Sequence, residues 1–328
     1  MYHNYNSIHY YKFITHIISY KGKKMKTKKN KKIVIFGGSG FLGNSLIKFL
    51  IKMDYEIILF TRKSSLKKLI EKYKFYSNIK IINWNVNDYE LVEKNILNSD
   101  CIINLCGILY ENKHGDFLKV HSHHPALLGK LSSKNKINKL IHVSALGVSE
   151  LSDSIYSRSK ASGERKLLES FPKAKILRPS LLFGKGDNFF GQFSEMASLS
   201  PFLPLISRST KFQPVFVDDV AQAIINLLES TKFKETTFEI GGEAIYSFEK
   251  LLKILLEVKN IKRVLIPLNP KMMMIPAFFL QQLPRPPFTV DQMKLLRKDN
   301  ILENNLPGLK ELGIKPTEMK KELINIYQ

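Results

Sequence analysis

A tyrosine and a lysine four positions apart, Tyr156 and Lys160, are the residues best suited to carry out chemistry. On a helix this spacing places both side chains on one face. A lysine ammonium near the phenol favours the phenolate, which would let Tyr156 exchange a proton during hydride transfer at a carbinol carbon. The same spacing recurs at Tyr20 and Lys24, Tyr76 and Lys80, and Tyr246 and Lys250. Only Tyr156 comes just after a predicted sheet strand, so we place the candidate site there.

A glycine-rich turn is the element that must bring a ligand to these residues. It reads Gly37-Gly38-Ser39-Gly40-Phe41-Leu42-Gly43 and follows the apolar run Ile33–Phe36, which is typical of a strand buried on both faces. Glycine lets the chain turn tightly, approach a pyrophosphate closely and lay the next helix, predicted over Phe41–Met53, on the sheet. The helix N-terminus then points its amides at the phosphates. The turn therefore predicts a dinucleotide site; the alternative is a glycine loop that binds nothing.

The end of the next predicted strand, Glu56–Phe60, bears on the choice of dinucleotide. Arg62 and Lys63 stand where an NAD-binding chain usually has a carboxylate for the ribose hydroxyls. Cationic side chains suit a 2′-phosphate, so NADP(H) is preferred and NAD(H) is the second possibility. The alternative to a phosphate contact is that Arg62 and Lys63 are two solvated basic side chains in a lysine-rich protein.

Composition narrows the class of protein. The 328 residues are 44% hydrophobic, enough for a sizeable core. The net charge of +22 is spread as lysine without an arginine-rich or aromatic patch, which argues against nucleic-acid binding. Two cysteines, Cys101 and Cys106, are predicted on opposite faces of a sheet and cannot usefully pair, which indicates a reducing compartment.

The first thirty residues, 1–30, contain no acidic residue and end in a lysine run. They lack the long apolar core of a signal peptide or a membrane span. Two interpretations compete: a disordered or cleavable targeting segment, or an upstream extension with the true start at Met25.

Strands and helices alternate from Lys31 to Val143, which predicts an α/β fold with a doubly wound parallel sheet. Ligands bind such sheets at the carboxyl ends of the strands. From Phe189 the pattern changes, and prolines interrupt the apolar stretches. The expected division is a dinucleotide-binding Rossmann domain, residues 31–185 plus 210–242, and a smaller C-terminal lobe, residues 186–209 plus 243–328.

Three other features have structural interpretations. The apolar run Met272–Leu280 is too short to span a bilayer, and we favour buried packing over contact with lipid or another subunit. The cluster His121–His124 lacks metal-ligand spacing, and Pro125 is expected to start a helix there, so no metal site is predicted. Asp219, beside Asp218, is expected to cap a helix over Val220–Leu228.

Taken together, Gly37-x-x-Gly40-x-x-Gly43, Ser144, Tyr156-x-x-x-Lys160, Leu177–Pro179 and Val217–Val220 resemble the extended and atypical short-chain dehydrogenase/reductase superfamily, whose members include epimerases and dehydratases. The segments Arg178–Gly184, Asp187–Phe190, Leu199–Ile206, Phe212–Val215 and Leu283–Pro287 resemble a narrower group within it. That group comprises the NADPH-binding accessory subunit of respiratory complex I and its bacterial relatives. The resemblance covers Lys31 to about Arg297.

The resemblance implies a set of site residues. Ser144, Tyr156 and Lys160 would be catalytic or vestigial. The cofactor would contact these three together with Gly37, Gly38, Ser39, Gly40, Phe41, Leu42, Gly43, Arg62, Lys63, Asn85, Val86, Leu105, Cys106, Gly107 and Pro179.

Two departures bear on activity. Ala145 stands where active epimerases and dehydratases usually carry Ser or Thr, and Asn85 replaces an aspartate common near the adenine. The resemblance therefore implies an accessory subunit that holds NADPH with little or no turnover, associated with complex I and with the membrane surface. It would lie on the cytoplasmic face of a bacterial membrane or, alternatively, on the matrix side in mitochondria. The competing hypothesis is an active NADP-dependent epimerase, dehydratase or reductase acting on a nucleotide-sugar or similar carbonyl compound.

Overall fold

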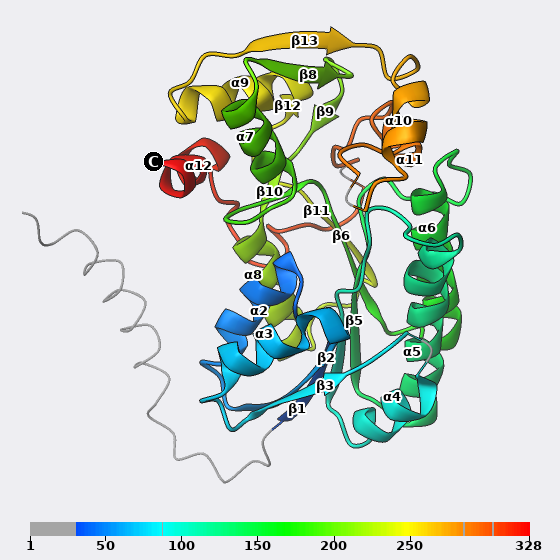
Figure 1. Ribbon diagram of the computed structural model, residues 1–328. Coiled ribbons are helices and arrows are strands. Elements are labelled where there is room, and N and C mark those ends of the chain that lie inside the picture. The colour runs from blue at the N-terminus through cyan, green and yellow to red at the C-terminus, as the bar shows by residue number, and fades with distance from the viewer. Residues whose placement is uncertain (1–30, 87, 285, 304) are drawn as a thin grey trace, which may run out of the picture. The chain divides into compact units, whose positions relative to one another are not determined.

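A seven-stranded parallel sheet forms the centre of the computed structural model, which describes residues 31–86, 88–284, 286–303 and 305–328 (Figure 1). Across the sheet the strands follow the order β11 (Thr237–Ile240), β6 (Lys175–Pro179), β5 (Lys139–Val143), β4 (Cys101–Asn104), β1 (Lys31–Phe36), β2 (Tyr55–Thr61) and β3 (Ile79–Asn83). This order confirms the predicted doubly wound sheet. The interpretations of residues 1–30 fall outside the described residues.

Helices cover both faces of the sheet (Figure 1). One face carries α2 (Phe41–Leu50), α3 (Lys63–Tyr73) and α8 (Val217–Glu229); the other carries α4 (Tyr89–Ile96), α5 (His124–Lys134) and α6 (Ile155–Ser170). In β1, Ile33 and Ile35 pack into the first layer, and Val34 and Phe36 into the second. Alternate side chains of a strand point to opposite faces, so a strand between two helical layers must be apolar throughout.

The two cysteines follow the same rule. Cys101 packs into the layer with α2 and α8, whereas Cys106 packs against the layer with α4 to α6. Both thiols are free. The prediction that they face opposite sides of the sheet is confirmed.

The strand order reverses between β1 and β4, and this reversal creates the ligand crevice of the fold. The chain leaves β1 toward β2 and β3 on one side, and returns through β4 toward β5, β6 and β11 on the other. In doubly wound sheets the loops diverge at such a reversal, and ligands bind in the crevice expected there, at the carboxyl ends of the strands.

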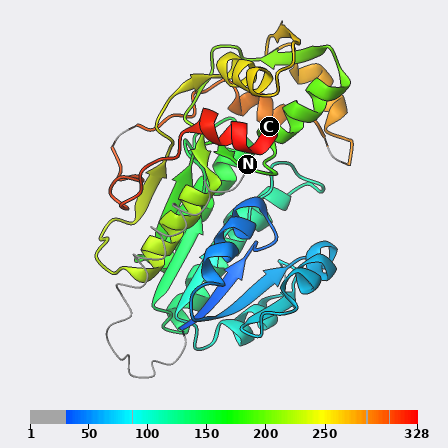
Figure 2. The same ribbon diagram turned by 90° about the vertical axis from the view of Figure 1, so that its left-hand side faces the viewer.

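A second group of helices and strands gathers beyond these carboxyl ends (Figure 2). They are β7 (Leu182–Phe183), α7 (Phe189–Leu199), β8 (Phe202–Ile206), β9 (Lys211–Phe212), β10 (Val215–Phe216), β12 (Tyr246–Ser247), α9 (Phe248–Val258), β13 (Val264–Leu268), α10 (Met274–Leu280), α11 (Val290–Leu295) and α12 (Met319–Tyr327). Buried phenylalanines such as Phe190, Phe193 and Phe248 form a core of their own there. Leu309 and Leu312, however, pack with α8 in the core of the sheet. The exact division into two domains stays a prediction.

The predicted helix cap at Asp219 is wrong. The two short strands β9 and β10 lie on either side of Pro214, and α8 already begins at Val217, three residues earlier than expected. Asp219 is therefore inside the first turn of α8 instead of capping it. Its carboxylate accepts hydrogen bonds from the amide (2.7 Å) and hydroxyl (2.8 Å) of Thr317 and so anchors the C-terminal segment.

The prediction of buried packing for Met272–Leu280 is also wrong for most of that run. Ala277 is fully buried, but Ile275, Phe278 and Phe279 are 72%, 56% and 68% exposed. The run folds as the short helix α10, and only its inner side reaches the small cluster with Ile206 and Met293. The other side faces solvent because no described element covers it.

Candidate functional site

The glycine turn after β1 is shaped for close approach of a ligand. Gly37 has a φ of +82°, and a Cβ there would lie 2.9 Å from the carbonyl carbon of Leu105. A Cβ on Gly43 would lie 2.6 Å from the carbonyl oxygen of Gly37, so that helix α2 could not rest on the turn. Gly40 is the N-cap of α2, and no described side chain caps it. The first amides of α2 are thus left to an anion.

The two basic residues after β2 stand at the start of α3. Arg62 is the N-cap residue of α3 in extended conformation, and Lys63 is its first helical residue; both side chains are exposed. Neither forms an ion pair with a carboxylate of the described residues. The amide of Trp84 donates to the carbonyl of Thr61 at 2.9 Å, which holds the end of β3 beside the end of β2. Asn85 and Val86 follow at this edge.

The segment after β4 crosses the crevice. The amide of Leu105 donates to the carbonyl of Phe36 at 2.9 Å, and that of Cys106 to the side-chain oxygen of Asn104 at 3.1 Å. Gly107 follows next to Lys160: a Cβ on Gly107 would lie 3.6 Å from the Lys160 ammonium nitrogen. Residues 105–107 therefore run from the glycine turn to Lys160.

Helix α6 carries Tyr156 and Lys160, as predicted from their spacing. Ser154 caps the helix, and the Lys160 nitrogen lies 5.9 Å from the centre of the Tyr156 ring. Lys160 is almost fully buried and donates to the carbonyl of Val143 at 3.3 Å. Burial lowers the pKa of Lys160 to about 8.

The expected phenolate is not favoured in this arrangement. Burial, and secondarily the negative charge of Asp291, raise the pKa of Tyr156. Desolvation disfavours the charged phenolate, and the Asp291 carboxylate disfavours it further. Tyr156 is therefore a neutral phenol at pH 7, able to donate a proton or a hydrogen bond.

Two strand ends complete the crevice. Ser144 follows β5, and its buried hydroxyl makes no hydrogen bond within the described part of the chain. Pro179 ends β6, and its carbonyl accepts from the amide of Leu146 at 2.9 Å. Buried hydroxyls normally have a partner, so Ser144 is suited to bind a ligand oxygen. Ala145 beside it offers no hydroxyl.

Two side chains that sequence reasoning did not assign to the site lie within it. Asp291, on α11, binds the first amides of α6, including that of Tyr156 at 3.1 Å. His121 accepts from the amide of Ile108 at 3.0 Å and faces the Tyr156 ring edge-on. It lies on η1 (Leu118–His123), a π-helical segment that runs directly into α5. Helix α5 begins at His124, one residue before the predicted start at Pro125. Among the described residues, no group of His, Cys, Asp or Glu is arranged to hold a metal ion.

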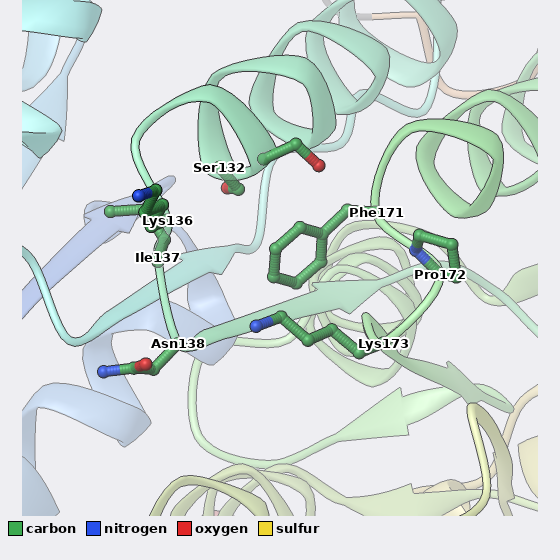
Figure 3. Close-up of a pocket in the computed structure, with 8 residues that line it drawn as sticks. Ser132, Lys136, Ile137, Asn138, Phe171, Pro172 and Lys173 are labelled. Carbon is green, nitrogen blue, oxygen red and sulfur yellow. The ribbon is translucent and has the colours of Figure 1, made fainter.

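A surface depression on the opposite edge of the sheet does not belong to this site. Figure 3 shows the Phe171 ring between Ser132 of α5 and Lys173. The depression lies where α5 and α6 end, and carbonyl groups at helix C-termini favour cations such as Lys136 and Lys173. Its charge therefore complements the helix ends and is not evidence of an anion site.

The sheet order, the glycine turn and the tyrosine-lysine helix agree with a comparison to known families. Residues 33–241 match the model of the NAD dependent epimerase/dehydratase family. The chain belongs to this family. Solved structures similar to this member include gox2253, with a TM-score of 0.70 and 19% identity over 90% of this chain and 97% of that one. The UDP-glucuronic acid 4-epimerase of Bacillus cereus has a TM-score of 0.68 and 17% identity over 90% and 98%. At these identities they support the fold alone.

The similarity between this member of the epimerase/dehydratase family and its curated relatives extends over most of its length. It is 29% identical over 300 residues to the mitochondrial NADH dehydrogenase (ubiquinone) 1 alpha subcomplex subunit 9 of Dictyostelium discoideum, covering 89% of this chain and 83% of that protein. The Mus musculus protein of the same name is 29% identical over 303 residues, covering 90% and 79%. The NADH-ubiquinone oxidoreductase 40 kDa subunit of Neurospora crassa is 24% identical over 290 residues, covering 87% and 76%.

Proposed function

We propose that this protein is an NADP(H)-binding accessory subunit of respiratory complex I with little or no turnover. The observation that carries the proposal is the similarity to subunits of this complex over about nine tenths of the chain, well beyond the residues of the family model. Under this proposal, the fold serves to bind a cofactor within the assembled complex.

The residues of the crevice fit a nicotinamide dinucleotide. The glycine cradle at Gly37 and Gly43 would be filled by any Cβ, which supports a close backbone approach to a pyrophosphate. Leu105, Cys106, Gly107 and Pro179 would line the path toward the nicotinamide. Bound there, NADP(H) would supply a hydride donor or acceptor.

NADP(H) is proposed over NAD(H) on the basis of the α3 N-terminus. Arg62 and Lys63 present two exposed cations without an acidic partner among the described residues. A bound 2′-phosphate would be attracted by both positive charges and by the positive end of the α3 helix dipole.

The proposal of low turnover concerns the other end of the crevice. Tyr156 could donate its proton to a substrate oxygen, and Lys160 could bind the ribose. Ala145 cannot bind the substrate oxygen as a second hydroxyl would, and Ser144 alone remains. The second candidate function, an active epimerase, dehydratase or reductase, is favoured by the intact Tyr156 and Lys160 pair.

A contact with the assembly is proposed for the outer face of α10. Exposed Ile275, Phe278 and Phe279 form an apolar surface, and the sequence from Lys259 to Val290 contains no acidic residue. An apolar surface within a basic segment suits a neighbouring subunit at the level of an anionic membrane surface. Within the residues that the structure describes, none of the helices has the length and apolar character needed to cross a bilayer.

We place the protein on the inner side of the membrane that carries complex I. The mitochondrial names of the relatives favour the matrix side; the cytoplasmic face of a bacterial membrane is the other placement.

The decisive experiment is native electrophoresis of mild-detergent extracts from the source cells, followed by absorbance and fluorescence spectra of the purified protein. Co-migration with complex I and retained NADPH are expected. Migration apart from the complex would contradict the proposed association with complex I. Turnover of a carbonyl substrate that is lost in Tyr156→Phe would establish the second function instead.

A further inference from the structure

We propose that His121 is a positioning residue for the nicotinamide half of the crevice, where its Nε2 atom holds the segment Leu105–Ile108 beside Tyr156 and Lys160. The inference rests on the proposed binding of NADP(H). It assigns a role to a histidine for which the sequence analysis considered a metal site, rejected it and predicted no other function.

A chain of hydrogen bonds joins the crossing segment to the tyrosine helix through this ring. The amide of Ile108 donates to His121 Nε2 at 3.0 Å. His121 Nδ1 lies 3.0 Å from the Ser159 hydroxyl, which itself donates to the carbonyl of Tyr156 at 2.8 Å. Because Nε2 must accept, the proton is on Nδ1 and the ring is neutral.

The segment that His121 holds touches both ends of the crevice. At its start, Leu105 is packed against the turn at Gly37, and at Gly107 it passes Lys160. Side chains hold two of its amides: Asn104 accepts from Cys106, and His121 accepts from Ile108. Without the second acceptor, no other side chain of the described residues would hydrogen-bond an amide of Gly107 or Ile108 and so tie this half of the segment to the α6 side.

The ring is itself held firmly. His121 is only 1% exposed, it stacks on Phe117 with 5.3 Å between ring centres, and the Tyr156 ring meets it edge-on at 5.2 Å. Its neighbourhood is π-helical, a conformation often found at functional sites. A neutral, packed imidazole can fix a backbone amide with little freedom of its own.

Three substitutions distinguish the role of His121 Nε2 as a hydrogen-bond acceptor from the role of the ring in filling space. The carboxamide oxygen of His121→Gln can reach the position of Nε2 and accept from Ile108. The shorter His121→Asn can donate to Ser159 but cannot reach Ile108, and His121→Leu can do neither. Gln and Asn are equally polar, so they form a matched pair for the cost of burying an amide.

The experiment measures NADPH dissociation constants by nicotinamide fluorescence, and the hydrogen exchange of the Ile108 amide in the protein without cofactor. We expect His121→Asn and His121→Leu to bind at least tenfold more weakly, with faster exchange at Ile108, and His121→Gln to stay within threefold of wild type. Melting temperatures show which variants fold.

Each outcome is decisive. If wild type binds and His121→Asn binds as tightly, or if all three variants weaken equally, His121 only fills space and the inference is wrong. If wild type does not bind NADPH at all, the proposed function fails. Slow exchange at Ile108 in wild type and His121→Gln, but not in His121→Asn, would then still show the anchor.

Discussion

The carboxylate of Asp291 accepts a hydrogen bond from the backbone amide of Tyr156 at 3.1 Å, although 135 residues separate them in the chain. The same carboxylate accepts from the amide of Ile155 and the hydroxyl of Ser154, both at 2.7 Å. An outer element, α11, thus supplies an anion to the N-terminus of the helix that carries the candidate catalytic residues.

Replacing this carboxylate should destabilise the protein. We expect Asp291→Ala to lower the free energy of unfolding by about 1–3 kcal/mol, because the amides of α6 lose their acceptor in a partly buried place. Urea denaturation measures the change. Asp153→Asn is the control, since it removes only an exposed ion pair with Arg297 and should cost less than about 0.5 kcal/mol. Equal losses in both variants would contradict the anchoring role.

Arg62 should discriminate between the two nicotinamide dinucleotides. We expect Arg62→Ala to weaken NADPH binding by about tenfold or more, and NADH binding by less than threefold, because only NADPH carries the 2′-phosphate. Fluorescence titration with each cofactor measures both constants. Lys67→Ala, which removes an exposed lysine of the same helix beyond its first turn, serves as the control. A similar loss for both cofactors would rule out a 2′-phosphate contact.

The outer face of α10 should matter for assembly and not for folding. We expect Phe278→Ser with Phe279→Ser to abolish co-migration with complex I and to leave the unfolding free energy within about 0.5 kcal/mol, because exposed side chains lose little on truncation. Phe75→Ser is the matched control, since Phe75 is 87% exposed on a different surface. Binding of the wild type to anionic vesicles without complex I, lost in the double variant, would indicate a lipid contact alone. Unchanged co-migration would remove α10 from the interface.

Three buried histidines should make the fold sensitive to acid. Burial lowers the pKa of His121 to about 2 and of His124 to about 3, and holds that of His142 well below its usual value. The unfolded chain binds these protons near pH 6.5 and the folded chain does not. Stability is therefore full above pH 6.5 and falls with pH below it, by up to about 1.4 kcal/mol per histidine and pH unit.

His124 offers the cleanest test of this dependence. Its ring nitrogens have no hydrogen-bond partner within the described residues, and it packs against Phe36 and Trp84. We expect His124→Phe to fold at pH 7. Between pH 6 and 5 its free energy of unfolding should fall less steeply than that of the wild type, by the contribution of one proton, about 1.4 kcal/mol per pH unit. Urea denaturation at both values measures the slope. An unchanged slope would mean that His124 takes up its proton in the folded state.

Local sequence was sufficient for the parts of this protein that local forces decide. The glycine turn, the strands buried on both faces and the tyrosine-lysine pair follow from backbone sterics and periodicity within a few residues. These patterns predict the parallel sheet, its ligand edge and the elements that carry Gly37, Arg62 and Tyr156. The comparisons support the same family.

Only the tertiary structure decided which distant side chains serve these elements. Asp291, His121 and the anchor between Asp219 and Thr317 depend on elements that meet in space, and no sequence spacing encodes such meetings. The exposure of Phe278 and Phe279 was decided in the same way: an apolar run predicts burial, but burial needs a covering surface. The fold covers Ala277 and leaves its neighbours open, because within residues 31–328, apart from the undescribed positions 87, 285 and 304, α10 has a packing partner on one side only.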